Sequence, residues 1–164
     1  MLLETTAQQG LWFLIPALPI CLWVAYTDLS TMRIPNMAVL ALFAVFVVVG
    51  FLTLPLGEYA WRFAHLAVVL VTGFVLSSFL GVGAGDSKFA AAMAPFVALG
   101  DVAEVLTIFC VLVFVTFALH RLSRSIAFIR RLAPSWESWT AKKFPMGITL
   151  TSTLAVYLGL AAAQ

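Results

Sequence analysis

The sequence predicts an all-α, polytopic membrane protein with six transmembrane helices. Of its 164 residues, 63% are hydrophobic and only 10% are charged, whereas about 25% of the residues in an ordinary soluble domain are charged. Nine basic and seven acidic side chains cannot give a soluble domain of this length a polar surface, so a soluble fold is excluded. Six crossings of about 20 residues each occupy most of the chain. We therefore expect residues 1–164 to form a single integral membrane domain.

Six apolar stretches, separated by glycine, proline or charged residues, define the predicted crossings. They cover residues 11–27, 37–54, 61–80, 89–99, 102–119 and 145–163. The fourth stretch is short enough to be a re-entrant segment that does not cross the bilayer. A helix that begins near Gly85 has roughly 15 residues and spans about 22 Å, so we predict a short but true crossing.

The basic residues predict the orientation of these helices. If every stretch changes sides, the first, third and fifth connections lie on the same side of the membrane. That side then holds eight of the nine basic residues: Arg33, Lys88, Arg121, Arg124, Arg130, Arg131, Lys142 and Lys143. Because basic residues accumulate in cytoplasmic loops, we expect this side to be cytoplasmic and both chain termini to lie outside. Arg62 is the single basic residue expected on the outer side.

The fifth connection, residues 120–144, is the only long one. Its segment 121–132 places apolar residues at helical spacing among arginines, and Trp136 and Trp139 follow. This pattern is typical of an amphipathic helix that lies in the membrane interface. We expect a basic topology anchor in the cytoplasmic loop; a docking surface for a substrate is the alternative.

Two acidic residues at the ends of predicted spans are candidates for chemistry, because polar groups at membrane depth cost free energy and usually mark function. Asp28 ends the first span and Asp86 begins the fourth, so both are expected at the cytoplasmic side. Two neighbouring carboxyl groups can share one proton. One then activates a water molecule, and the other polarises a carbonyl group. Each acid alone is also explained by a helix cap or an interfacial charge.

A glycine-rich segment, Gly81–Gly85, directly precedes Asp86. Glycines permit positive φ and close backbone approach, which suits an extended peptide lying beside the acid. Close helix packing also explains such glycines, whereas a phosphate cradle is disfavoured because the GxxxxGK[ST] pattern is absent. Lys88 and Arg33 either serve Asp86 and the substrate directly or act only as topology anchors.

Other kinds of chemistry find little support in the sequence. His65 and His120 lie far apart, and neither HExxH nor GxSxG occurs, so metalloprotease and serine hydrolase motifs are lacking. Cys21 and Cys110 lie singly in apolar stretches, where packing is the expected role. A net charge of +2 gives no reason to expect a nucleic-acid partner. We expect no cofactor and no metal.

Three segments together resemble the type IV prepilin peptidase family of GxGD intramembrane aspartic proteases. Gly83-Ala84-Gly85-Asp86 matches the GxGD signature, and the lysine two residues later resembles the family's GxGDxK form. The segment from Asp28 to Arg33-Ile34-Pro35-Asn36 resembles the first-aspartate motif of this family. Phe144-Pro145-Met146-Gly147 resembles its PFG or PYG element, in which the methionine is a departure.

This resemblance implies an aspartic endopeptidase that cleaves a prepilin or pseudopilin after its short, positively charged leader at the cytoplasmic face, without a metal or a covalent intermediate. The catalytic pair it implies is Asp28 and Asp86. The supporting residues it implies are Gly83, Gly85, Lys88, Arg33, Pro35, Asn36, Pro145 and Gly147. The main alternative is a non-enzymatic transporter, channel or assembly factor in which the two acids bind an ion or a proton.

The resemblance also suggests a subfamily. Larger prepilin peptidases carry an N-terminal cytoplasmic extension with paired CxxC motifs and methylate the cleaved pilin, whereas only ten residues precede the first predicted span here. We therefore expect no methyltransferase activity and a short form similar to the peptidases of tight-adherence (Flp-type) pili. Archaeal preflagellin or prepilin peptidases, and a different peptide cut by the same GxGD chemistry, are the alternatives. The oligomeric state is open.

Overall fold

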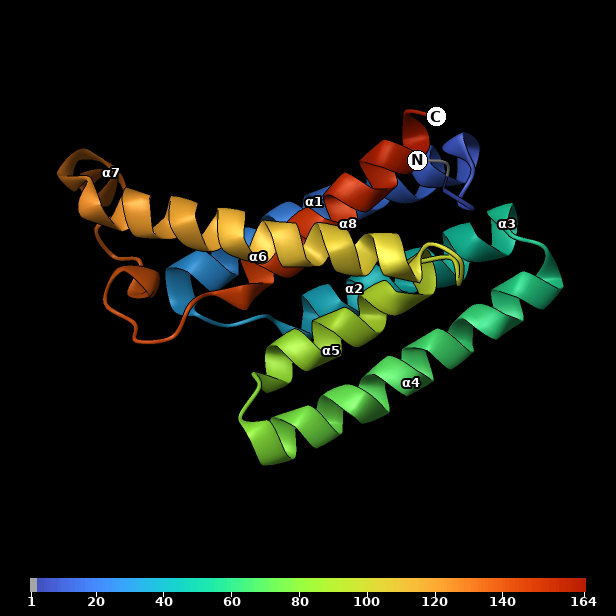
Figure 1. Ribbon diagram of the computed structural model, residues 1–164, viewed down its shortest axis with the longest axis horizontal. Coiled ribbons are helices and arrows are strands. Elements are labelled where there is room, and N and C mark those ends of the chain that lie inside the picture. The colour runs from blue at the N-terminus through green and yellow to red at the C-terminus, as the bar shows by residue number, and fades with distance from the viewer. Residues whose placement is uncertain (1–2) are drawn as a thin grey trace.

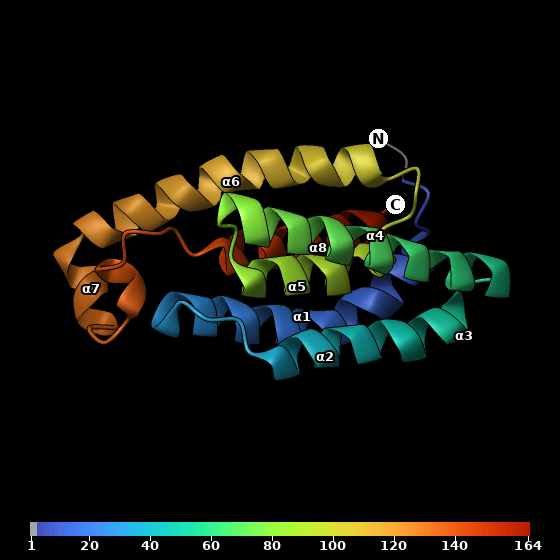
Figure 2. The same cartoon turned by 90° about the horizontal axis from the view of Figure 1, so that it is seen from below.

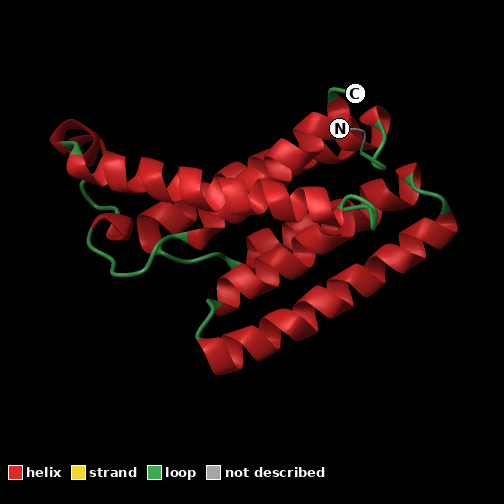
Figure 3. Cartoon of the chain, in the orientation of Figure 1, coloured by secondary structure: helices red, strands yellow, loops and turns green. Residues whose placement is uncertain are grey.

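A computed structural model describes residues 3–164, and every regular element among them is a helix (Figure 3). The helices are α1 (Ala7–Thr31), α2 (Asn36–Val45), α4 (Leu56–Leu80), α5 (Ala84–Met93), α6 (Val102–Ser125) and α8 (Met146–Ala162). The short elements are η1 (Phe46–Gly50), α3 (Phe51–Thr53), η2 (Ala94–Phe96), α7 (Ala127–Leu132) and η3 (Glu137–Trp139). The all-α prediction is confirmed.

Each of the six predicted apolar stretches contains helix. Four helices are long and apolar enough to cross a membrane: α1, the continuous helix Asn36–Thr53, α4 and α6. Helix α8 is apolar but has only 17 residues. Helix α5 begins at Ala84, as expected, but has only 10 residues before η2 extends it to Phe96. A membrane protein with several spanning helices is therefore established, while six crossings stay a prediction.

The helices form a bundle in which α1 and α8 make the most extensive contact. Helix α8 also packs against α6, and α2 packs against both α1 and α5. Seen from below, α6 lies on one side of the bundle and α1 and α2 on the other (Figure 2). Helix α4 runs along the edge beside α5, and the N- and C-terminal ends of the chain lie together (Figure 1).

An aromatic cluster fills the core towards the end that holds the termini. Phe46 is fully buried and packs against Phe13, Tyr59, Phe63 and Phe96, with ring centroids between 5.4 and 6.1 Å apart. Phe46 begins the π-helical turn η1, which interrupts the regular α-helix at this position. An inserted residue of this kind changes the direction of the side chains around it. It is a feature that apolar composition alone does not reveal.

Polar side chains at this same end join segments that are far apart in the sequence. Asp101, at the N-cap of α6, accepts hydrogen bonds from the backbone amides of Glu4 (2.6 Å) and Thr5 (3.0 Å) and from the hydroxyl of Tyr157 (2.7 Å). Gln164 donates from Nε2 to the Thr5 carbonyl oxygen at 3.1 Å. These bonds hold the beginning of α1, the beginning of α6 and the end of α8 together.

The single basic residue predicted for this end is not a free surface charge. Arg62 is only 2% exposed and forms a salt bridge with Glu58 at 2.6 Å. Its Nη1 also donates to the carbonyl oxygen of Pro95 at 3.1 Å. Because Arg62 lies near the beginning of α4 and Pro95 on η2, the bond fastens this part of α4 to the remainder of the bundle.

The long connection folds differently from the prediction. Helix α6 continues to Ser125, so the first turn of the predicted amphipathic helix 121–132 belongs to the preceding helix. The chain breaks at Ile126, whose ψ of 110° is extended, and only residues 127–132 form a separate helix. Trp139 is buried and stacks on His120 at 5.6 Å. The tryptophan therefore packs within the protein, and its expected position at the membrane interface stays a prediction.

Candidate active site

Asp28 lies in the last turn of α1 and is buried, with 4% of its surface exposed. The helix ends at Met32, whose positive φ of 53° directs its backbone N–H to the carbonyl oxygen of Asp28 at 3.0 Å. This turn fixes the backbone that carries the carboxyl group. Among the described residues, Oδ2 of Asp28 has no hydrogen-bond partner. A buried polar atom without a partner is uncommon, and it often marks a functional position.

Helix α8 begins directly against this carboxyl group. Pro145 is the N-cap of α8, and Gly147 and Ile148 place their backbone amides near Asp28. A Cβ atom on Gly147 would lie 2.7 Å from Asp28 Oδ2 and 2.8 Å from its Cγ. Glycine is therefore required here for space. The structure thus brings the predicted supporting residue Gly147 to the first predicted aspartate, and Pro145 begins the helix that carries it.

Asp86 lies in the first turn of α5 and is half-buried. The preceding glycines act in different ways. Gly81 adopts a positive φ of 69° and allows the chain to leave α4. Gly83 has an ordinary φ of −59°, but an added Cβ would collide with Oδ2 of Asp86 and lie 3.2 Å from its Cγ. A Cβ on Gly85 would only touch Ile34, at 3.4 Å. The expectation of positive φ therefore holds for Gly81 and not for Gly83, which provides space instead.

Asp28 and Asp86 line one cavity of about 440 Å³, although they come from helices that are 52 residues apart at their nearest ends. The predicted residues that line it are Asp28, Arg33, Asn36, Gly83, Gly85, Asp86 and Lys88. Pro35 and Pro145 do not line the cavity; they are the N-caps of α2 and α8. The proximity expected from span parity is thus present in the folded chain.

Lys88 does not pair with the acid that precedes it. Its Nζ donates to Oδ1 of Asn36 at 3.3 Å, which links the start of α5 to the start of α2. Within residues 3–164, the one salt bridge is that between Arg62 and Glu58. Of the two roles considered for Lys88, contact with Asp86 therefore finds no support in this geometry.

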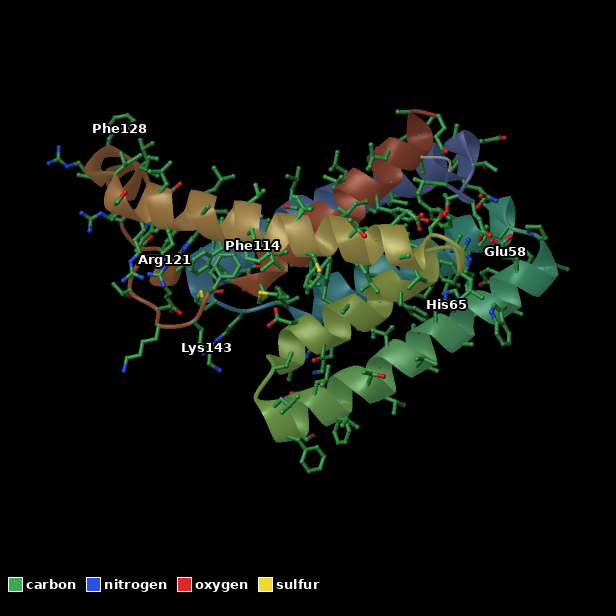
Figure 4. All side chains as sticks on the ribbon, viewed as in Figure 1. Glu58, His65, Phe114, Arg121, Phe128 and Lys143 are labelled. Carbon is green, nitrogen blue, oxygen red and sulfur yellow. The ribbon has the colours of Figure 1, made fainter. Side chains whose placement is uncertain are left out.

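Lys143 is the basic residue whose charge acts on Asp86, and it also lines the cavity. Figure 4 shows Lys143 at the same end of the bundle as Arg121 and far from Glu58 and His65. The sequence assigned Lys143 only to the orienting charges of the long loop. No sequence signal distinguishes it from Lys142, because its place depends on how the chain enters α8.

The cavity contains two carboxyl groups and three lining basic residues, Arg33, Lys88 and Lys143. No group of three or more His, Cys, Asp or Glu side chains that could hold a metal ion occurs within residues 3–164. Two carboxyl groups close enough to influence each other can divide the roles of proton acceptor and proton donor.

The fold and this cavity define a helical membrane protein in which two acidic side chains, one at the end of α1 and one at the start of α5, line the same cavity. Comparison with protein-family models gives a more specific result: the type IV leader peptidase family matches residues 15–119, and the chain belongs to this family. It is thus an aspartic prepilin leader peptidase by family. The matched segment includes Asp28 and Asp86, whereas Pro145 and Gly147 lie beyond it.

The comparison with curated proteins and the comparison with solved structures gave no match. The family assignment nevertheless decides between the two main alternatives left by the sequence. It identifies an enzyme that acts on prepilin leader peptides, and it does not support a non-enzymatic transporter, channel or assembly factor.

Proposed function

We propose that Asp28 and Asp86 are the catalytic pair of a membrane-embedded endopeptidase that removes the leader peptide of type IV prepilins. The observation that carries this proposal is the common cavity: two acidic residues from distant helices line it, in a chain of the type IV leader peptidase family. The unpartnered Oδ2 of Asp28 supports it further, since a carboxyl group retained only for stability would be expected to have a hydrogen-bond partner.

In the proposed reaction, one carboxylate accepts a proton from a water molecule as its oxygen attacks the scissile carbonyl carbon. The other carboxyl group, protonated at the start, donates a hydrogen bond to the carbonyl oxygen and stabilises the developing negative charge. Collapse of the tetrahedral intermediate breaks the C–N bond, and the departing nitrogen takes the proton that the first carboxylate accepted from the water molecule, so that the carboxyl pair returns to its starting state. No covalent bond forms between the enzyme and the substrate.

We assign the base to Asp86 and the acid to Asp28. Asp86 begins α5, where the helix dipole favours a negative charge, and Lys143 adds a positive charge beside it. Asp28 is more buried and ends α1, where the dipole favours the neutral form. The amides at the start of α8 act in the opposite direction on Asp28. Because the two groups influence each other, the assignment describes the dominant arrangement of a shared proton.

We further propose that the cavity faces the cytoplasm. The connections at the aspartate end carry eight of the nine basic residues, and basic residues accumulate on the cytoplasmic side. The C-terminus then lies outside, together with the N-terminus. A reporter fused after Gln164 that is active only outside the cytoplasm tests this orientation; activity of a cytoplasm-specific reporter at that position would contradict it.

The substrate we propose to test first is a Flp-type prepilin, the substrate class implied by the resemblance to the peptidases of tight-adherence pili. The experiment is co-expression of this prepilin with the wild type, Asp28→Asn or Asp86→Asn. The wild type should convert the prepilin to a shorter product, and each variant should reduce the rate by about 10³-fold or more, since a positioned acid or base contributes up to ~10⁴-fold.

Two controls make this experiment decisive. Asp101→Asn removes a carboxylate at the opposite end of the bundle and should leave cleavage intact in the folded protein. An archaeal-type prepilin, assayed in parallel, distinguishes the two candidate substrate classes. Cleavage near the wild-type rate by either Asp28→Asn or Asp86→Asn would disprove the proposed catalytic pair.

A further inference from the structure

We infer that an apolar groove between α4, α5, α6 and α8 binds the apolar segment of the substrate that adjoins the scissile bond. The inference rests on the proposed peptidase function and locates a specificity-determining surface for it. The groove has a volume of about 550 Å³, which lies within the range of ligand-binding cavities. Its wall on α4 consists of Val69, Thr72, Gly73 and Leu76.

The groove is continuous with the aspartate cavity. Five residues line both spaces: Gly83, Asp86, Lys143, Phe144 and Met146. Asp86 therefore lies where the polar cavity and the apolar groove join. A molecule that fills the groove ends beside this carboxyl group, and the opposite wall is provided by Phe109 of α6 and Leu150 of α8.

Helix α4 leaves this wall available to a ligand. In α4 only Arg62 and Gly73 are buried. A Cβ atom on Gly73 would lie 2.9 Å from Cβ of Ser87, so α4 approaches α5 closely at this one position. Arg62 fastens the same helix near its other end. Tyr59 and Phe63 also pack against the aromatic core, and His65 contacts the carbonyl oxygen of Val97. Further along α4, Val69, Thr72 and Leu76 line the groove.

An apolar peptide segment fits this arrangement better than a lipid chain does. The groove is lined mainly by apolar side chains, and the polar groups of Asp86 and Lys143 are confined to the shared end. A peptide with its apolar segment in the groove places the neighbouring peptide bond at the carboxyl groups. An acyl chain would place no hydrolysable bond there.

The test fills the groove and compares two substrates. Thr72→Phe adds a ring to the groove wall, and Val71→Phe adds the same ring on the adjacent residue of α4, which is 63% exposed and does not line the groove. The substrates are a Flp-type prepilin and the same prepilin truncated about five residues after the scissile bond, too short to fill such a groove.

Thr72→Phe should raise the KM for the full prepilin by at least about tenfold, with little change in kcat, because only binding of the apolar segment is lost. On the truncated substrate, Thr72→Phe and the wild type should have the same kcat/KM. Val71→Phe should match the wild type on both substrates. Val69→Phe, a second substitution in the same wall, should repeat the result and serves if Thr72→Phe does not fold.

Each other outcome has a defined meaning. Equal KM values for Thr72→Phe and Val71→Phe on the full prepilin would overturn the inference, because the groove would then take no part in substrate binding. Equal losses by Thr72→Phe on both substrates would also overturn it, since the substitution would then act on the aspartates. If the wild type cleaves neither substrate, the proposed function itself fails, and this inference fails with it.

Discussion

Asp28 and Asp101 are both buried aspartates at helix ends, one at each end of the bundle, with 4% and 2% of their surfaces exposed. Asp101 accepts hydrogen bonds from two backbone amides and the Tyr157 hydroxyl. Asp28 has an oxygen without a partner and faces a cavity that it shares with Asp86. The two acids are thus equally buried but differ in their hydrogen bonds, and this difference supports the proposal that Asp28 has a role beyond stability.

The segments around the two acids also differ in how tightly they are joined. At the Asp101 end, the polar groups join the two chain ends, and Gln164 contacts both Leu3 and Thr5. At the Asp28 end, Gly147 keeps space open around the carboxyl group. The Asp101 end is held together by hydrogen bonds, whereas the Asp28 end contains a cavity. Substitutions at the Asp101 end should therefore change stability, and substitutions at the Asp28 end should change the rate of cleavage.

The largest effect in this comparison is expected from Gly147→Ala. The new methyl group would lie less than 3 Å from Cγ of Asp28 and must displace the carboxyl group. Displacement of a reacting group by about 1 Å can cost on the order of 100-fold in rate. Prepilin cleavage should therefore fall by about that factor, measured as initial rates on protein that remains folded in detergent.

Gly159→Ala is the matched control on the same helix, because a Cβ atom at Gly159 meets nothing within 4 Å. It should retain the wild-type rate. If Gly147→Ala is as active as Gly159→Ala, the space beside Asp28 has no part in catalysis.

The next effect concerns the Asp101 end. Asp101→Asn should destabilise the protein by about 1.5–3 kcal/mol, the range for hydrogen bonds to charged groups, because its amide group cannot accept from all three donors. Tyr157→Phe removes the bond to Asp101 together with the contacts of the same hydroxyl to Thr5 Oγ1 (2.6 Å) and to the amide of Ala98 (3.3 Å), and it should cost a similar amount, about 1–3 kcal/mol. Thermal unfolding in detergent measures both. Cleavage per folded molecule should stay unchanged, and a loss of activity with unchanged stability would reverse the roles given to the two ends.

A pH titration sharpens the same contrast. Burial opposes ionisation of Asp101, but the amides of Glu4 and Thr5 and the hydroxyl of Tyr157 outweigh it and hold the pKa of this carboxyl below its usual value. A lowered pKa in the folded state stabilises the protein above the unfolded-state pKa of about 3.9, and this stabilisation is lost as the pH falls through the folded-state pKa.

The advantage of the wild type over Asp101→Asn in unfolding temperature should thus be constant near neutral pH and shrink below about pH 4. The asparagine does not titrate, so the difference isolates Asp101 from the other acids. A difference that stays constant down to about pH 2 would show that the charge of Asp101 does not contribute.

The contrast between the two ends is partly visible in the sequence. The alternation of apolar stretches and short connections already places Asp28 and Asp86 at the same end, because the two crossings between them, residues 37–54 and 61–80, return the chain to the side it left. The motif around Asp86 marks the glycines, and the structure adds why: Gly81 provides a positive φ, whereas Gly83 provides space.

Other features depend on contacts that no local pattern encodes. Helical periodicity carries little information in lipid-facing segments, so neither the π-helical turn at Phe46 nor the groove along α4 was predictable. The structural role of Asp101 could not be predicted from the sequence either, since its hydrogen-bond partners Thr5 and Tyr157 lie 96 and 56 residues away. The break at Ile126 was missed because apolar and basic residues continue at helical spacing on both sides of it.

The smallest predicted effect is a difference in cleavage rate between substitutions of two neighbouring lysines, Lys142 and Lys143. Both are exposed, but Lys143 lines the aspartate cavity and acts on Asp86, whereas Lys142 does not line it. Lys143→Met should slow cleavage about fivefold, or roughly 1 kcal/mol, which is the interaction energy of one solvent-exposed charge pair. Lys142→Met removes the same charge from the same loop and should have no effect.

Because an accessible charge pair is screened by salt, the deficit of Lys143→Met relative to Lys142→Met should shrink as the salt concentration rises from about 0.05 M to about 1 M. Initial cleavage rates across this range measure it. A deficit that does not depend on salt would mean that Lys143 acts through its contacts with the adjoining groove and not through its charge on Asp86. Equal rates for both variants at low salt would remove Lys143 from the site and leave the two aspartates with only the glycines and helix ends to position them.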